Sequence, residues 1–332
     1  MNAPPIAVGF AGLGRMGVPM AGQLITAGFD VTVYNRTSAT ASAFAAEHAS
    51  QVAATPRELA AISPIVVTMV ADGNALLALL DGDDGLLAGV QPGGVVVDMG
   101  TTGLEHTQLV RARLAERNVE LVEAPVSGSV AAARAKTLLV MAAGEPRALD
   151  AVMPILDAMA GTIIRVGGPG AGAAMKLAVN AVLFGLNQAI AESLVLAERA
   201  GIDRITAYEV FASSAVAAPV VHYRRAVFEQ PGTTPVTFSI DLAVKDLGLI
   251  AHLASSVGTT MPQADANLDV MRRASSAGLG NADMGEVATF IRRTPPAPTE
   301  PLSCASQVTT RIQSAAPPSV DSDTDRKGSS HR

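Results

Sequence analysis

The sequence predicts an α/β fold: a Rossmann-type, doubly wound and mostly parallel sheet, followed by an all-α C-terminal domain. Three observations support this. Short, continuous apolar runs alternate with helical patterns in the first half, as in a parallel sheet covered on both faces. A glycine-rich turn, Gly12-x-Gly14-x-x-Gly17, stands between the first apolar run and the first helical pattern. From residue 171 onward, the apolar spacing is that of helices.

The first βαβ unit occupies residues 6–37. Gly12 is expected to make the tight turn, Gly14 to let the backbone approach a pyrophosphate, and Gly17 to allow close packing of helix on strand. Backbone N–H groups at the start of the helix would hold the phosphates. The turn therefore predicts dinucleotide binding by Gly12, Leu13, Gly14, Arg15, Met16 and Gly17.

Asn35, Arg36 and Thr37 follow the second predicted strand. NAD-binding sites usually place an acidic residue here, whereas a guanidinium can bind a 2′-phosphate through charge-assisted hydrogen bonds. These three residues predict a preference for NADP(H), with NAD(H) still possible. The alternative is an ordinary solvated turn with Arg36 pointing into water.

The remaining elements follow in alternation and then become helical only. The predicted domains are a Rossmann domain over 1–167, a helical substrate and dimerisation domain over 168–293, and a disordered tail over 294–332 that is rich in Pro, Ser and Thr. Further strands are predicted at 65–70, 95–98, 119–122, 137–142 and 162–166, and helices at 105–117, 146–159 and 171–200.

Composition excludes several classes of function. The net charge of −6 over 332 residues, without a basic run, argues against a nucleic-acid partner. The apolar segment 177–191 is too short to span a bilayer and is expected to be a buried helix. The histidines are scattered, so no metal site is expected. Cys304 alone cannot form an internal disulfide, and the N-terminus lacks the basic stretch of a secretory signal, so a cytoplasmic location is expected.

Lys176 and Asn180 are four residues apart and share one face of a helix. Hydride transfer to a carbonyl leaves negative charge on oxygen, which an ammonium group can stabilise and protonate. Ser127 and the Gly128 N–H could bind a substrate carboxylate. Asp98, at a strand end, is expected to stabilise the following turn rather than to act as a base.

Five ordered motifs resemble the β-hydroxyacid dehydrogenase family, which includes 3-hydroxyisobutyrate dehydrogenase and the glyoxylate/succinic semialdehyde reductases. They are GLGRMGVPMAGQL, VYNRT, EAPVSGS, GPGAGAAMKLAVN and the Phe238 to Leu247 segment, and the resemblance spans about residues 6–291. It implies an NADP(H)-dependent oxidoreductase that transfers a hydride between nicotinamide and a small β-hydroxyacid or aldehyde acid. A homodimer or homotetramer is expected.

The resemblance also implies residue roles. The catalytic residues would be Lys176 and Asn180, which would also contact substrate together with Ser127, Gly128 and Ser129. Thr101 and Lys245 would lie near the cofactor, with the loop at Val70 and Ala71. The chain departs from the family where Ser129, Ala132 and Lys136 replace glycines and Gly100 replaces a serine. Because of these departures, the resemblance does not determine which substrate the protein uses.

Two alternatives remain. Imine reductases share this cofactor domain but generally lack the lysine, so Lys176 argues against that activity. A non-catalytic NADP-binding scaffold is the other, because the helical domain is rich in Ala and Leu, as expected for subunit packing.

Overall fold

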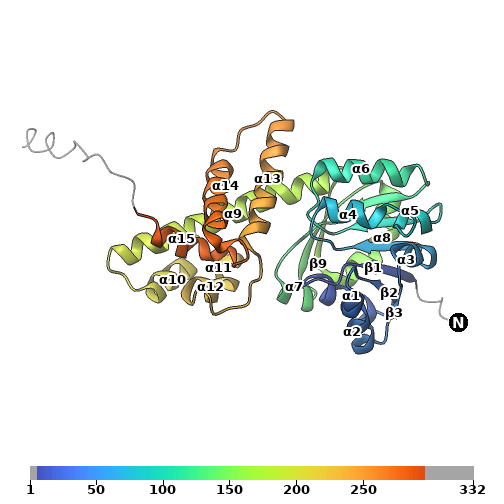
Figure 1. The fold of residues 1–332 in the computed structure, drawn as a ribbon, viewed down its shortest axis with the longest axis horizontal. Coiled ribbons are helices and arrows are strands. Elements are labelled where there is room, and N and C mark those ends of the chain that lie inside the picture. Colours follow the sequence, from blue (N-terminus) through green and yellow to red (C-terminus); the bar gives the residue numbers. More distant parts are fainter. Residues whose placement is uncertain (1–5, 296–332) are drawn as a thin grey trace, which may run out of the picture. The chain divides into compact units, whose positions relative to one another are not determined.

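A nine-stranded mixed sheet forms the first half of the chain in the computed structural model, which describes residues 6–295. The strand order is β3-β2-β1-β4-β5-β6-β8-β7, with β9 paired to β8. Figure 1 shows this half of the chain in blue and green, with helices packed around the sheet. The predicted tail, with Cys304, lies outside the described residues apart from its first two positions. The strands are β1 (Ala7–Ala11), β2 (Asp30–Tyr34), β3 (Gln51–Val52), β4 (Ile65–Thr68), β5 (Val95–Asp98), β6 (Glu120–Glu123), β7 (Val126–Ser127), β8 (Leu138–Ala143) and β9 (Ala160–Gly167).

The sheet is parallel from β3 to β6 and also between β8 and β9. Antiparallel pairing occurs where β8 meets β6 and β7. The prediction of a mostly parallel sheet is confirmed. The two-residue strands β3 and β7 were not predicted, because so short a segment carries no periodicity.

Alternate side chains of the central strands enter two different apolar cores. Val67 and Val97 pack with α1 (Gly17–Thr26), α2 (Ser38–His48) and α8 (Pro146–Met159). Val66 and Val96 pack with the helices on the opposite face. These are α3 (Pro56–Ile62), α4 (Gly73–Leu80), α5 (Leu86–Gly89) and α6 (Leu104–Ala115). Helices on both faces make the sheet doubly wound, as predicted.

The glycine-rich turn joins β1 to α1 with very little space. Gly12 has a φ of +104°, and a Cβ there would lie 2.3 Å from the Met69 carbonyl oxygen. A Cβ on Gly17 would lie 1.9 Å from the carbonyl oxygen of Gly12. A Cβ on Gly14 would meet no atom within 4 Å. Gly12 and Gly17 are therefore required by the fold, whereas Gly14 leaves open space beside the backbone.

Helices form the second half and have a core of their own, which includes Phe184, Tyr208, Leu247 and Met271. Between residues 171 and 295 the structure contains no strand, only an isolated bridge from Ser239 to Asp283. The elements are α9 (Ala171–Arg199), α10 (Arg204–Ser213), α11 (Pro219–Tyr223), α12 (Arg225–Glu229), α13 (Ile240–Ser256), α14 (Pro262–Ala274), a π-helical turn (Ser275–Leu279), a 3-10 turn (Met284–Glu286) and α15 (Val287–Arg293); α7 (Val130–Arg134) belongs to the first half. The described residues up to Arg292 form one compact unit, so the boundary at 167/168 stays a prediction.

Helix α9 is the one helix among the described residues that is long and apolar enough to cross a bilayer. Half of its most apolar stretch is buried within the protein, where Leu177 and Phe184 pack in the helical core. Its other face is open, with Val182 73% and Leu196 71% exposed. The prediction of a buried helix at 177–191 is therefore correct for one face of α9 only.

Candidate active site

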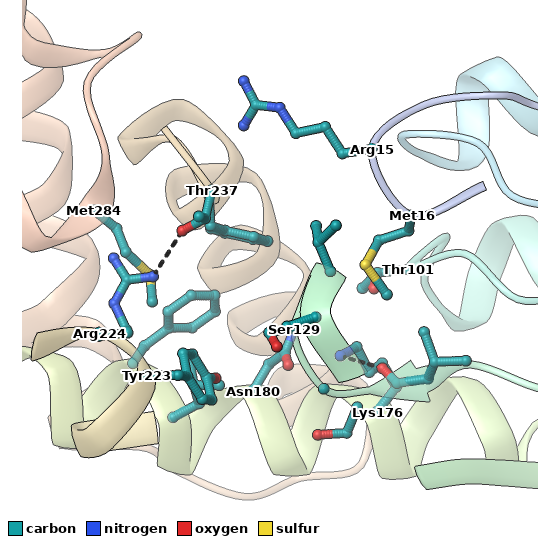
Figure 2. Close-up of a pocket in the computed structure, with 18 of the residues that line it drawn as sticks. Arg15, Met16, Thr101, Ser129, Lys176, Asn180, Tyr223, Arg224, Thr237 and Met284 are labelled. Carbon is teal, nitrogen blue, oxygen red and sulfur yellow. Dashed lines mark hydrogen bonds between the residues drawn. The ribbon is translucent and has the colours of Figure 1, made fainter. Parts of the chain in front are cut away.

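A cavity of about 380 Å³ lies at the carboxyl ends of the strands, where open α/β sheets bind their ligands. Met69, Met99 and the loop at Ser127 line it from the sheet. Residues of α9 and of the segments that follow it line the other side (Figure 2). The cavity brings together Arg15, Met16, Thr101, Ser127, Gly128, Ser129, Lys176 and Asn180 from the predicted site.

Lys176 projects from α9 into this cavity, and its Nζ donates a hydrogen bond to the Val126 carbonyl oxygen at 2.8 Å (Figure 2). Burial lowers the pKa of Lys176 to about 8, with a smaller contribution from the positive charge of Lys245. The carboxylate of Asp246 opposes this shift. The side-chain amino group of Lys176 can therefore gain or lose a proton near neutral pH.

Asn180 is held by a chain of polar contacts. Its Nδ2 donates to Asp246 Oδ2 at 2.8 Å, and Asp246 Oδ1 forms an ion pair with Lys245 Nζ at 2.8 Å. Lys245 also donates to the carbonyl oxygens of Ala71 and Thr101, each at 2.9 Å. The ammonium group of Lys245 thus joins α13 to the loops that follow β4 and β5.

Asp246 had no predicted role, although it is buried between Asn180 and Lys245. The pattern of its helix did not single this residue out, because α13 also carries Asp241 and His252 beside Lys245. The spacing within the chain could not identify Asn180 as its buried partner.

The loop from Ser127 to Ser129 borders the cavity next to Lys176. Gly128 has a φ of +145°, and a Cβ there would lie 2.7 Å from Leu138 Cδ2, so a larger residue would not fit. Ser129 Oγ accepts from the Ala132 N–H at 3.2 Å and caps α7. Ser129 is therefore a helix cap as well as part of the cavity wall.

The residues predicted to bind the adenosine end have unequal roles. Asn35 Oδ1 accepts from the Leu13 N–H at 3.0 Å, and Nδ2 donates to the Thr37 carbonyl at 3.1 Å, so the side chain fixes the turn itself. Arg36 and Thr37 are exposed beside it.

Arg15, in the glycine-rich turn, also contacts the helical half of the protein, because its guanidinium donates to the Val236 carbonyl oxygen.

The turn is suited to a dinucleotide. No side chain caps the N-terminus of α1, and its first turn carries no acidic residue that would repel a phosphate. The open space beside Gly14 allows close approach of a pyrophosphate. The backbone around Gly12, Gly14 and Gly17 would hold the phosphates.

Asp98 has the structural role that was predicted. It accepts hydrogen bonds from the Thr68 and Thr102 hydroxyls, both at 2.9 Å, and from the Gly100 N–H at 3.3 Å. Burial raises the pKa of this carboxyl group. Its oxygens are committed to the end of β4 and to the turn after β5.

Glu123 also had no predicted role. It forms an ion pair with Arg111 and accepts from the N–H groups of Gly170, at 2.6 Å, and Ala173, at 3.0 Å. The carboxylate thereby binds the N-terminus of α9 to strand β6. Arg224 and Asp283 are a second unpredicted pair, almost fully buried at the far side of the cavity.

Comparisons with known proteins agree with this architecture. One family model, for the NAD binding domain of 6-phosphogluconate dehydrogenase, matches residues 7–168. Another, for NAD-binding of NADP-dependent 3-hydroxyisobutyrate dehydrogenase, matches residues 170–291.

Individual relatives match at similar levels. Glyoxylate/succinic semialdehyde reductase 2, chloroplastic, from Arabidopsis thaliana is 31% identical, covering 86% of this chain and 80% of that protein. For 3-sulfolactaldehyde reductase of Escherichia coli (strain K12) the identity is 31%, with coverage of 86% and 96%. The crystal structure of 3-hydroxyisobutyrate dehydrogenase from Salmonella typhimurium aligns with a TM-score of 0.80 and 30% identity, covering 86% of this chain and 99% of that one. The chain belongs to the β-hydroxyacid dehydrogenase family of NAD(P)-dependent oxidoreductases.

Proposed function

We propose that this protein is an NADP(H)-dependent dehydrogenase of a small β-hydroxyacid or the corresponding aldehyde acid, of the 3-hydroxyisobutyrate, glyoxylate or succinic semialdehyde type. Lys176 acts as its general acid and base. The observation that carries the proposal is the position of Lys176 Nζ, which lies in the cavity at the strand ends, next to the Ser127 loop, with a pKa of about 8.

The nicotinamide supplies or accepts the hydride when the cofactor is bound. In reduction, the protonated Lys176 donates a hydrogen bond to the substrate carbonyl oxygen and then gives up its proton as negative charge develops there. In oxidation, neutral Lys176 takes the proton from the hydroxyl group. Burial lowers the lysine pKa and makes both protonation states accessible.

The substrate carboxylate is bound by Ser127 and the backbone of Gly128. Glycine at position 128 lets the backbone adopt its φ of +145°. Because glycine has no side chain, nothing on this residue blocks the approach of a carboxylate to its N–H. Asp246 fixes the Asn180 amide, four residues after Lys176 on α9, so that Asn180 orients the substrate or the lysine.

The preference for NADP(H) rests on Arg36. Its exposed side chain follows Asn35, whose two hydrogen bonds fix the end of β2 against the glycine-rich turn. A guanidinium at that place can bind a 2′-phosphate.

The test of the proposed function compares wild-type protein with Lys176→Ala. Each is given NADPH with glyoxylate, succinic semialdehyde, methylmalonate semialdehyde or a cyclic imine. We expect turnover of at least one aldehyde acid, and a loss of about 10²–10⁴-fold in kcat for the variant, as for removal of a general acid. Lys136→Ala, at an exposed lysine, is the control.

Other outcomes decide between the alternatives. Carbonyl reduction that survives in Lys176→Ala contradicts the assigned mechanism. Turnover of the imine alone assigns an imine reductase, and NADPH binding without turnover of any compound assigns a scaffold. Lys176 in the cavity supports neither alternative.

A homodimer or homotetramer in the cytoplasm remains part of the proposal. The exposed apolar side chains Val182 and Leu196 on α9 support self-association.

A further inference from the structure

Part of the cavity lies beyond Lys176 and Asn180 and is not used by the roles proposed above. Figure 2 shows Arg224, Tyr223 and Met284 on the opposite side of Asn180 from Lys176. Tyr223, Arg224 and Thr237 line this part, but most of its wall is apolar, and we call it the apolar chamber. Its apolar wall is formed by Leu183, Phe184, Val227, Phe238 and Met284.

The chamber is built into the helical core. Phe184, Val227 and Met284 are buried, and the rings of Phe184 and Phe238 pack with centroids 5.9 Å apart. Leu183 and Phe238 are half-buried and complete the lining. The chamber therefore has fixed walls rather than loose surface side chains.

The charge of Arg224 at the chamber is paired, although its buried Nε has no hydrogen-bond partner among the described residues. The Arg224 guanidinium forms an ion pair with Asp283 and donates to Thr237 Oγ1 at 3.3 Å. Asp283 also accepts from the Thr237 N–H and hydroxyl, each at 2.9 Å. The chamber therefore offers contact surface to an apolar group, while Asp283 already neutralises the charge of Arg224.

The chamber lies further along α9 than Lys176. Phe184 lies eight residues after Lys176 on α9, which corresponds to about 12 Å along the helix axis. A substrate as small as glyoxylate, held at Lys176, would leave the chamber to water, and apolar walls hold water poorly.

We propose that the substrate carries an apolar substituent, alkyl or aromatic, which occupies the apolar chamber while the carboxylate is bound at the Ser127 loop. Leu183, a half-buried residue of the chamber wall, limits how large this substituent can be. This inference rests on the proposed function and narrows its substrate class to β-hydroxyacids with an apolar side chain. The reaction is unchanged: the alcohol carbon loses a hydride to NADP⁺ and its hydroxyl group loses a proton to Lys176.

A homologous substrate series tests the inference. The purified enzyme oxidises 3-hydroxypropanoates that carry methyl, ethyl, propyl or benzyl at C-2, so that the reacting CH₂OH group is constant. We expect kcat/KM to rise about fourfold per methylene from methyl to propyl, equivalent to about 0.8 kcal/mol each. The analogue with a 2-carboxyethyl group at C-2 has the same three-carbon chain as propyl but ends in a carboxylate. Its kcat/KM should be no higher than that of the methyl compound.

A pair of variants locates the effect. Leu183→Phe adds bulk to the wall of the chamber, and Val182→Phe adds the same side chain at the neighbouring, exposed position of α9. We expect the propyl-to-methyl ratio of kcat/KM to fall about tenfold in Leu183→Phe, the effect of about one to two methylenes in a tight pocket. The ratio should be unchanged in Val182→Phe.

Different results would overturn the apolar chamber alone or the proposed function as well. A flat or falling series, with the methyl compound turned over, overturns the apolar chamber alone. A preference for the carboxyethyl compound overturns it in favour of anion binding by Arg224. Absence of turnover with every acid overturns both this inference and the proposed function.

Discussion

Lys176 shows how a single residue acquires chemistry from its surroundings. A free lysine is protonated at neutral pH. In this cavity, burial and the nearby Lys245 lower its pKa, while Asp246 limits the change. The resulting value of about 8 lies close to working pH, where a general acid and base is most effective.

The pH dependence of activity follows from this pKa. Reduction requires protonated Lys176, so its kcat/KM should be constant below about pH 8 and fall above it. Oxidation requires neutral Lys176, so its kcat/KM should rise through the same pH. Steady-state rates from pH 6 to 10 in both directions measure this.

Two variants control the pH experiment. Asp246→Asn removes the charge that opposes the shift, so the inflection should move to lower pH. Lys176→Arg cannot deprotonate and should abolish the inflection. An inflection that remains in Lys176→Arg contradicts the assignment.

Arg36 should decide between the two cofactors. In Arg36→Ala, we expect NADPH to bind about 10- to 100-fold more weakly, the effect of losing charged hydrogen bonds worth about 1.5–3 kcal/mol. NADH binding should change little. Titration of cofactor fluorescence measures both affinities, with Arg117→Ala as an exposed-arginine control. Equal weakening for both cofactors contradicts a 2′-phosphate contact.

Lys136 illustrates a departure from the family that the structure explains in part. This residue has a φ of +56° and is exposed. Such a conformation favours glycine, which is the residue the resemblance led us to expect. The side chain at this position lies on the surface and is absent from the cavity lining.

Among the elements, α9 matters most for the site, because it carries both Lys176 and Asn180. Its N-terminus is held by Glu123, whose carboxylate accepts two backbone N–H groups and pairs with Arg111. A Cβ on Gly172 would lie 2.8 Å from the Glu123 Cβ, so helix and strand are in direct contact. Lys176 lies one turn further along the helix.

Glu123→Gln should therefore affect both stability and catalysis. The amide lacks the charge that Arg111 and the helix N-terminus require, and we expect a loss of about 2 kcal/mol in the free energy of unfolding. We also expect a lower kcat with nearly unchanged NADPH affinity, because the cofactor turn is elsewhere. Chemical denaturation, kinetics and binding measure these effects.

Glu120→Gln is the matched control, since Glu120 is an exposed glutamate on the same strand. It should alter none of the three quantities. Wild-type stability in Glu123→Gln contradicts the anchoring role.

For the whole molecule, contacts between the sheet and the helices complete the site. Lys245 on α13 binds the carbonyl oxygens of Ala71 and Thr101, and Lys176 on α9 binds that of Val126. Neither half of the chain contains the whole site. The cavity exists because both halves contribute to its lining.

Local patterns were enough to predict much of this protein. The Gly12-x-Gly14-x-x-Gly17 turn, the buried strands and the helical second half each have a periodicity or a steric requirement that can be read within a few residues. The resemblance of five ordered motifs located Lys176, Asn180 and the Ser127 loop. For this reason the fold class and the family could be predicted without coordinates.

Only the tertiary structure decided which distant residues meet. The partnership of Asn180 with Asp246, the hold of Glu123 on α9, and the burial of Arg224 with Asp283 join residues 47 to 66 positions apart. The apolar chamber likewise joins α9, α12 and the segments at Phe238 and Met284. Such contacts depend on how helices pack, which a local pattern does not encode, and they set the pKa of Lys176 and the shape of the cavity.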